Sequence, residues 1–195
     1  TSTQQHMRRV IQLGENPKTV FNVGGLGAQA IFDYNMLTKK KLEKKLGIKF
    51  LKKNLLVTYH PETLSKNKTL SNLEELLNSL DEFFETNIIF TMPNADEGFK
   101  KFFNAIEKFV SINPNKRKMF KSLGHLNYLS CMNFVDAVVG NSSSGLLEAP
   151  SFKIGIINIG NRQKGRVRSS NIIDVRPQKA QISKAINQVY SKDYQ

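Results

Sequence analysis

Short apolar runs alternate along the chain with longer stretches in which apolar residues recur every three or four positions. The short runs are rich in branched and aromatic residues and stand close to Gly, Pro, Asn or Ser, which predicts strands. They cover residues 20–23, 55–59, 88–92, 137–139, 154–158 and 172–175, with 116–121 as a weaker candidate. This alternation predicts an α/β fold: a Rossmann-like, mostly parallel sheet flanked by helices.

The longer stretches have the spacing of amphipathic helices. Residues 73–84 and 99–110 carry apolar side chains at helical intervals, and both helices are expected to cover the sheet. Helices are also predicted at 4–13, 38–46 and 178–190, the second beginning at Thr38 and ending at Gly47. Because no repeat or linker interrupts the pattern, we expect residues 1–195 to form one domain. The absence of an initiator Met suggests a piece of a longer protein.

Composition is that of an ordinary globular protein, with 39% apolar and 23% charged residues. No apolar stretch reaches the length of about 18 residues that a membrane span needs, so we expect a soluble, cytoplasmic protein without a membrane partner. The single cysteine, Cys131, excludes an internal disulfide, stands in an apolar helical context and is expected to be a packed thiol. We expect no metal site.

Charge is the unusual property, because the formal net charge of +13 favours an anionic partner. One basic region, residues 38–56, holds eight Lys against one Glu. We interpret it as a solvated helix face; the interleaved aromatic residues typical of nucleic-acid binding are missing, so no nucleic-acid partner is expected. A second basic region begins at Arg162.

Small polar residues follow the predicted strand 137–139. Ser142, Ser143, Ser144 and Gly145 occupy a turn that leads into a predicted helix. The free N–H groups and the positive dipole of such a helix start, together with the hydroxyls, suit a phosphate group. Glu148, about one turn later, could accept hydrogen bonds from a vicinal diol such as ribose. The alternative is a connecting turn in which a Ser caps the helix and Glu148 is solvated.

A basic loop, residues 158–168, follows the next predicted strand. Loops after successive parallel strands open at the same edge, so Arg162 and Arg166 could converge on the anion at the Ser turn. A solvated basic loop is the alternative. His60 stands where another strand ends before Pro61, so it belongs to the same edge; a lone His is more often structural than functional.

Residues 25–30 formally match the dinucleotide pattern G-x-G-x-x-A after a predicted strand. The acidic residue that should bind the ribose is missing from the end of the second strand, where His60 stands. Nicotinamide binding is therefore disfavoured, and no cofactor is expected. A flexible glycine connection is the simpler interpretation.

Together these segments resemble the UDP-N-acetylglucosamine 2-epimerases, and among them the hydrolysing type of sialic and other nonulosonic acid biosynthesis. The resemblance extends over residues 10–15, 20–24, 57–61 and 138–166. The last run contains Asn-Ser-Ser-Ser-Gly, Glu-Ala-Pro, Asn-Ile-Gly and Arg-Gln-Lys-Gly-Arg in the family's order. The resemblance implies a two-domain GT-B fold. This chain would be its C-terminal, UDP-binding half, without the N-terminal domain.

The resemblance also implies roles for individual residues. Ser142 and Ser143 would hold the diphosphate, Glu148 the ribose hydroxyls and Arg162 a phosphate, while His60 would lie near the sugar diphosphate. The backbone near Leu123 would lie beside the uracil ring. The expected UDP-binding set is Leu123, Ser142, Ser143, Ser144, Gly145, Glu148, Arg162 and Arg166. His60 and Arg162 are the expected catalytic residues, because they would stabilise the leaving diphosphate.

The family reaction eliminates UDP from UDP-N-acetylglucosamine and hydrates the glycal to N-acetylmannosamine, as a glycosidase-type hydrolase. The acid and base carboxylates come largely from the N-terminal half in the family, so this chain alone is expected to be inactive. Pro61, where the non-hydrolysing branch has Arg, favours the hydrolysing branch. A UDP-diacetamido-trideoxy sugar as substrate and a GT-B glycosyltransferase are the alternatives. The full-length protein is expected to be a homodimer.

Overall fold

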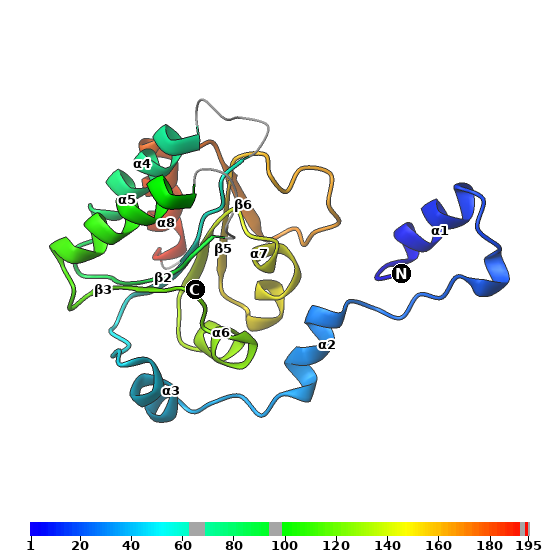
Figure 1. Cartoon of the computed structure of the whole chain (residues 1–195), viewed down its shortest axis with the longest axis horizontal. Coiled ribbons are helices and arrows are strands. Elements are labelled where there is room, and N and C mark those ends of the chain that lie inside the picture. The colour runs from blue at the N-terminus through cyan, green and yellow to red at the C-terminus, as the bar shows by residue number, and fades with distance from the viewer. Residues whose placement is uncertain (63–68, 94–98, 192–193, 195) are drawn as a thin grey trace. The chain divides into compact units, whose positions relative to one another are not determined.

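The computed structural model describes residues 1–62, 69–93, 99–191 and 194 (Figure 1). The chain divides into two compact units, Thr1–Asn35 and Met36–Gln195. The smaller unit contains helix α1 (Gln4–Gln12), the 3₁₀ helix η1 (Pro17–Thr19) and helix α2 (Leu26–Asp33). The side chain of Thr3 caps α1 by accepting the N–H of His6 at 3.1 Å. The predicted helix 4–13 is therefore confirmed.

The strand predicted at residues 20–23 is wrong. This segment is extended but unpaired, and Phe21 and Val23 are exposed. Among the described residues its backbone bonds to Thr1, through the carbonyl of Phe21 and the N–H of Val23. A strand needs a neighbouring strand for its backbone groups, and the unit Thr1–Asn35 contains none. The glycine pattern at 25–30 thus follows coil, without the strand of a dinucleotide-binding turn.

Six parallel strands form one sheet in the larger unit. Their order is β3-β2-β1-β4-β5-β6. The strands are β1 (Asn54–Thr58), β2 (Asn87–Thr91), β3 (Arg117–Phe120), β4 (Ala137–Gly140), β5 (Gly155–Ile159) and β6 (Ile172–Val175). The other six predicted strands are confirmed to within a residue or two, and so is the α/β fold class.

Helices cover both faces of this sheet. Helices α4 (Thr69–Leu80), α5 (Phe99–Ile112) and α8 (Lys179–Val189) lie together on one face (Figure 1). The other helical segments that the structure describes in the larger unit are α3 (Lys39–Leu46), α6 (His125–Met132), α7 (Ser144–Leu147) and the 3₁₀ helix η3 (Ala149–Phe152). Gly47 ends α3 as predicted, with φ 62°. The helix predicted at 73–84 ends earlier, at Leu80, and Phe84 is exposed.

The core extends above and below the sheet. Leu55 and Val57 pack in the cluster beneath α4, α5 and α8, while Leu56, which points to the opposite face, is buried as well. Burial on both faces explains why these strands are continuous apolar runs and not alternating patterns. Cys131 is fully buried, which confirms the expected packed thiol, and burial raises its thiol pKa to about 12.

The direction in which successive strands are added reverses between β1 and β4, the two central strands. In open parallel sheets such a switch point leaves a crevice at the carboxyl ends of the strands. Thr58 ends β1 opposite Gly140 of β4. A Cβ on Gly140, where φ is 138°, would lie 1.9 Å from the Thr58 carbonyl oxygen, so this close approach requires glycine.

No helix in the described part of the chain combines the length and apolarity of a bilayer span.

Candidate functional site

A cleft of about 670 Å³ lies at the carboxyl ends of β1, β2 and β4. Six of the residues predicted to form the site line it: His60, Leu123, Ser142, Ser143, Ser144 and Arg162. They come from four separate loops, brought together by the strand order. Gly145 does not line the cleft; it is buried, and Val138 and Ile156 lie next to it.

A buried amide fixes the floor of the cleft. Asn141 is fully buried, and its Oδ1 accepts the His60 N–H at 2.6 Å while its Nδ2 donates to the His60 carbonyl at 2.9 Å. The Asn141 carbonyl in turn accepts from Arg162 Nη1 at 3.1 Å and from Gln163 Nε2 at 2.7 Å. One residue therefore ties the loops after β1, β4 and β5 together. Sequence reasoning did not single out Asn141, although it lies inside the Asn-Ser-Ser-Ser-Gly run.

Three hydroxyl groups form a chain along one wall. Tyr128 Oη lies 2.6 Å from Ser144 Oγ, which donates to Ser142 Oγ at 3.1 Å. Burial is the main cause that raises the pKa of Tyr128, so its proton is retained for hydrogen bonding. The hydroxyls of Ser142 and Ser144 are thereby oriented before any ligand arrives.

The start of helix α6 contributes a further wall that was only partly foreseen. Leu123 was predicted, whereas Gly124, His125 and Tyr128 were not, and all four line the cleft. Gly124 caps the helix with φ 69° and no side-chain cap bond, which leaves the first N–H groups of α6 available. Applying the rule for post-strand loops to the weak strand 116–121 would have found this segment.

Glu148 stands beside the cleft, outside its immediate lining. One of its carboxylate oxygens is buried without a hydrogen-bond partner among the described residues. Burial raises the pKa of this carboxyl, and attraction to His125, which lines the cleft, partly opposes the shift. Glu148 caps the end of α7, a helix of only four residues, and is not inside a longer helix as predicted. An unpaired acceptor here suits a ligand hydroxyl.

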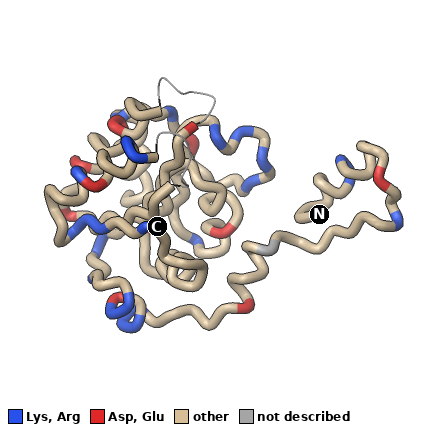
Figure 2. The backbone as a smooth tube through the Cα atoms, viewed as in Figure 1, with Lys and Arg blue, Asp and Glu red and all other residues tan. Residues whose placement is uncertain are grey.

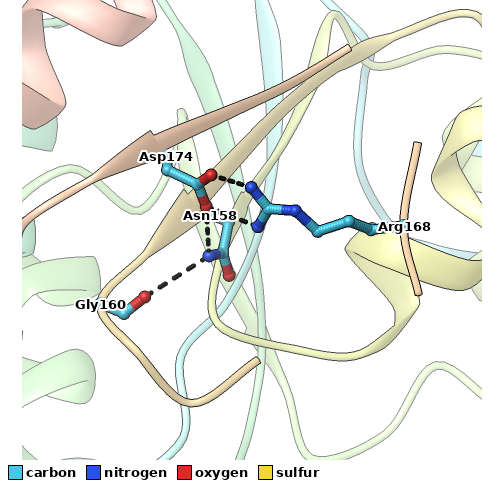
Figure 3. Close-up of polar contacts among 4 residues, drawn as sticks. All are labelled: Asn158, Gly160, Arg168 and Asp174. Carbon is cyan, nitrogen blue, oxygen red and sulfur yellow. Dashed lines mark hydrogen bonds and ion pairs between the residues drawn. The ribbon is translucent and has the colours of Figure 1, made fainter. Parts of the chain in front are cut away.

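The basic loop after β5 does not converge on one point. Arg162 lines the cleft, but Arg166 lines a separate cavity of about 500 Å³ with Lys164 and Arg168. Arg168 forms an ion pair with Asp174, which also accepts from Asn158 Nδ2 at 2.8 Å (Figure 3). Bonds to the Asn141 carbonyl hold Arg162 and Gln163 beside the cleft, whereas the later basic residues of the loop line the separate cavity. A role for Arg166 in ligand binding remains a prediction.

A parallel sheet with this strand order and a polar cleft at its switch point defines a Rossmann-like α/β protein. The model of the UDP-N-acetylglucosamine 2-epimerase family matches residues 1–195. The chain therefore belongs to that family.

Curated relatives show the same family. The chain is 44% identical over 173 residues to the GDP/UDP-N,N'-diacetylbacillosamine 2-epimerase (hydrolyzing) of Campylobacter jejuni, covering 89% of the chain and 45% of the relative. It is 41% identical over 188 residues to the polysialic acid biosynthesis protein P7 of Escherichia coli, covering 96% and 47%. The chain thus spans about half the length of the curated relatives that it matches.

Solved structures agree on the fold. The UDP-GlcNAc 2-epimerase of Methanocaldococcus jannaschii superposes with a TM-score of 0.72 at 17% identity, covering 100% of the chain and 55% of that structure. A UDP co-structure of MnaA from S. aureus gives 0.70 at 14% identity, covering 99% and 50%. At these identities the likeness shows the fold, and the chain again corresponds to about half of each structure.

Proposed function

We propose that the chain binds the UDP moiety of a nucleotide sugar in the switch-point cleft and is the C-terminal half of a hydrolysing UDP-sugar 2-epimerase. One observation carries the proposal: the cleft combines preoriented Ser hydroxyls and Arg162 with a buried Glu148 oxygen at its side that has no hydrogen-bond partner among the described residues. Donors for a diphosphate beside an acceptor for a diol match the two ends of a nucleoside diphosphate.

The proposed pose follows the walls of the cleft. The diphosphate lies at Ser142, Ser143 and Arg162, where hydroxyl and guanidinium groups donate. The ribose reaches Glu148, whose buried oxygen then gains the partner that it lacks. The uracil lies along the segment that begins at Leu123, where the backbone at the start of α6 offers hydrogen bonds.

Departure of UDP develops negative charge on the phosphate oxygens. Arg162 and His60 line the cleft and supply groups that stabilise this charge more in the transition state than in the ground state. No Asp or Glu is present among the described residues that line the cleft. In the family the acid and base carboxylates come largely from the N-terminal half, so we propose that the group that removes the C2 proton comes from a second half and that this chain alone does not turn over.

Two sugars are candidates for the substrate. UDP-N-acetylglucosamine is the substrate implied by the family, and the products are UDP and N-acetylmannosamine. The second candidate is a UDP-diacetamido-trideoxy sugar, because the Campylobacter jejuni relative is named a GDP/UDP-N,N'-diacetylbacillosamine 2-epimerase. Family membership favours both over a glycosyltransferase. We also propose that the full-length protein is a cytoplasmic homodimer.

Thermal unfolding in the presence of UDP tests the binding role. Millimolar UDP should raise the Tm of the chain, and Glu148→Ala or Ser143→Ala should reduce this increase. Glu107→Ala and Ser151→Ala are matched controls, because both residues are exposed and outside the cleft. An unchanged Tm for the wild-type chain at millimolar UDP would overturn the proposal.

Product analysis tests the reaction separately. The chain alone should release no UDP from UDP-N-acetylglucosamine, and release at a rate typical of an enzyme would contradict the proposed division of labour. For the full-length protein, proton NMR should show the free 2-epimerised sugar. A sugar transferred to an acceptor would instead establish a glycosyltransferase.

A further inference from the structure

A second charged cavity lies at the opposite edge of the sheet, where the strands begin. Its volume is about 550 Å³, and Lys40, Lys44, Lys49 and Lys118 line it. We call these four residues the lysine pocket. Figure 2 shows that basic residues gather on α3, which carries the first two. The sequence alone suggested only a solvated helix face here.

The fold brings these lysines together from three elements. Lys40 and Lys44 are four residues apart on α3 and therefore share one face of the helix. Lys49 belongs to the loop after α3, and Lys118 lies on β3. The fold thus places lysines that are almost 80 positions apart in the sequence around one cavity. A solvated face of α3 alone would not bring Lys118 there.

The loop that carries Lys49 is firmly anchored. Gly47 turns the chain in the left-handed region, and the buried side chains of Ile48 and Phe50 fix the loop on the core. Glu43 Oε1 accepts the Phe50 N–H at 2.8 Å. The side-chain amide of Asn87, at the start of β2, donates to the Lys49 carbonyl at 3.3 Å. The ammonium groups therefore project from a fixed frame.

The charge in the pocket is largely uncompensated. Glu43 is the one acidic residue among the described residues that line it. None of the four lysines forms an ion pair with another described residue, whereas Lys116 pairs with Glu85 and Lys179 with Glu82. Like charges around one cavity repel each other, and a bound polyanion would relieve that repulsion.

We propose that the lysine pocket binds a compact polyanion that carries at least two adjacent phosphate groups. Ammonium groups bind phosphate as point charges, and the amide of Asn115 adds a polar contact. No aromatic side chain is found among the described lining residues, so there is no platform on which a nucleobase would stack. The chemistry therefore favours a small oligophosphate over a nucleic acid strand.

Calorimetric titration of the full chain with inorganic triphosphate tests this site. The variant Lys40→Gln/Lys44→Gln/Lys49→Gln/Lys118→Gln should bind at least about tenfold more weakly. The matched control is Lys39→Gln/Lys41→Gln/Lys45→Gln/Lys52→Gln, which removes the same charge from exposed positions outside the pocket. The control should stay within about threefold of the wild type. Equal losses in the two variants would overturn the site and show diffuse attraction.

Two further measurements separate this pocket from other anion sites. Excess UDP, which would occupy the switch-point cleft, should leave the lysine-dependent part of triphosphate binding unchanged; a loss of all triphosphate binding in excess UDP would assign triphosphate to the switch-point cleft and overturn the proposal. A single-stranded oligonucleotide should bind more weakly than triphosphate at physiological salt. Tighter oligonucleotide binding that disappears in the lysine-pocket variant would identify a nucleic-acid surface instead. Circular dichroism and Tm verify that each variant is folded.

Discussion

The two edges of the sheet differ in the groups that they would offer to an anion. At the carboxyl edge, the cleft is built from hydroxyl groups, helix-terminal N–H groups and one tethered guanidinium, held by the buried Asn141. At the amino edge, the lysine pocket is built from the ammonium groups of lysines on α3, on the loop after it and on β3. The first edge has directional donors in a tight frame, and the second has charge with little directional bonding.

This difference indicates how each edge should respond to substitution. Packing and hydrogen bonds at the carboxyl edge are part of the fold, so changes there should affect stability and ligand binding together. Three lysines of the pocket are exposed and only Lys118 is half-buried, so changes there should affect binding more than stability.

Gly140→Ala should have the largest effect. The new Cβ would lie 1.9 Å from the Thr58 carbonyl oxygen in the centre of the sheet, so β1 and β4 would have to separate. We expect a loss of more than about 4 kcal/mol in the free energy of unfolding, measured by urea denaturation. Gly47→Ala is the control at the amino edge: φ is also positive, but there is open space, and the loss should be about 1–2 kcal/mol. Similar losses in the two variants would contradict the expected difference between the two edges of the sheet.

Asn141→Ala should follow. It removes both partners of the His60 backbone and leaves buried polar groups unsatisfied, so we expect a loss of about 2–4 kcal/mol in urea denaturation and weaker UDP binding. Asn115→Ala, in the lysine pocket, removes an exposed amide and should change stability by less than about 0.5 kcal/mol. A tolerated Asn141→Ala would show that the loops are held by other contacts.

Arg162→Gln should separate the two edges in ligand binding. Loss of the guanidinium should weaken UDP binding by about tenfold or more, because a hydrogen bond to a charged group is lost. The four-residue variant of the lysine pocket should bind UDP within about threefold of the wild type, since its charges lie at the far edge. Calorimetry with UDP measures both. A larger loss in the lysine variant would mean that UDP binds at the amino edge.

Glu148→Gln should give the smallest effect, seen as a pH dependence. Because burial raises the pKa of this carboxyl in the fold, the folded protein holds the proton more tightly than the unfolded chain does. Wild-type stability is therefore lost as pH rises from about 4.5 through the raised pKa, and Gln avoids that loss. Urea denaturation should show a more stable variant at pH 7 and no difference below about pH 4.

Glu43→Gln is the comparison at the amino edge. Its carboxylate already accepts the Phe50 N–H, so replacement by a neutral amide should weaken that bond and lower stability slightly at pH 7. A gain in stability at pH 7 for Glu43→Gln, or a loss for Glu148→Gln, would contradict the opposite effects expected for the two substitutions.

Most elements of the larger unit could be predicted from sequence because strand and helix formation follow local periodicity. Six predicted strands and the helices around them appear close to the expected residues. The strand at 20–23 could not be judged locally, because its formation depends on a partner strand that the unit Thr1–Asn35 does not contain. The early end of α4 also depends on where Phe83 packs against the core.

The sequence was sufficient to predict the cleft residues that directly follow strands. Ser142, Ser143, Ser144, Arg162 and His60 follow strands, and parallel pairing brings the ends of strands together. Family resemblance supplied Leu123. The contributions of His125 and Tyr128 were missed, because their presence in the cleft depends on β3 being a real strand and on where α6 then begins.

By itself, the sequence determined the class of fold, the edge at which the cleft forms and the family, since these follow from periodicity and from motifs read in order. Only the tertiary structure decided which basic residues line the same cavity. It separated Arg162 from Arg166, tied three loops through Asn141, and joined Lys118 to the lysines of α3. The physical reason is that convergence depends on long-range strand pairing and loop anchoring, which no local pattern records.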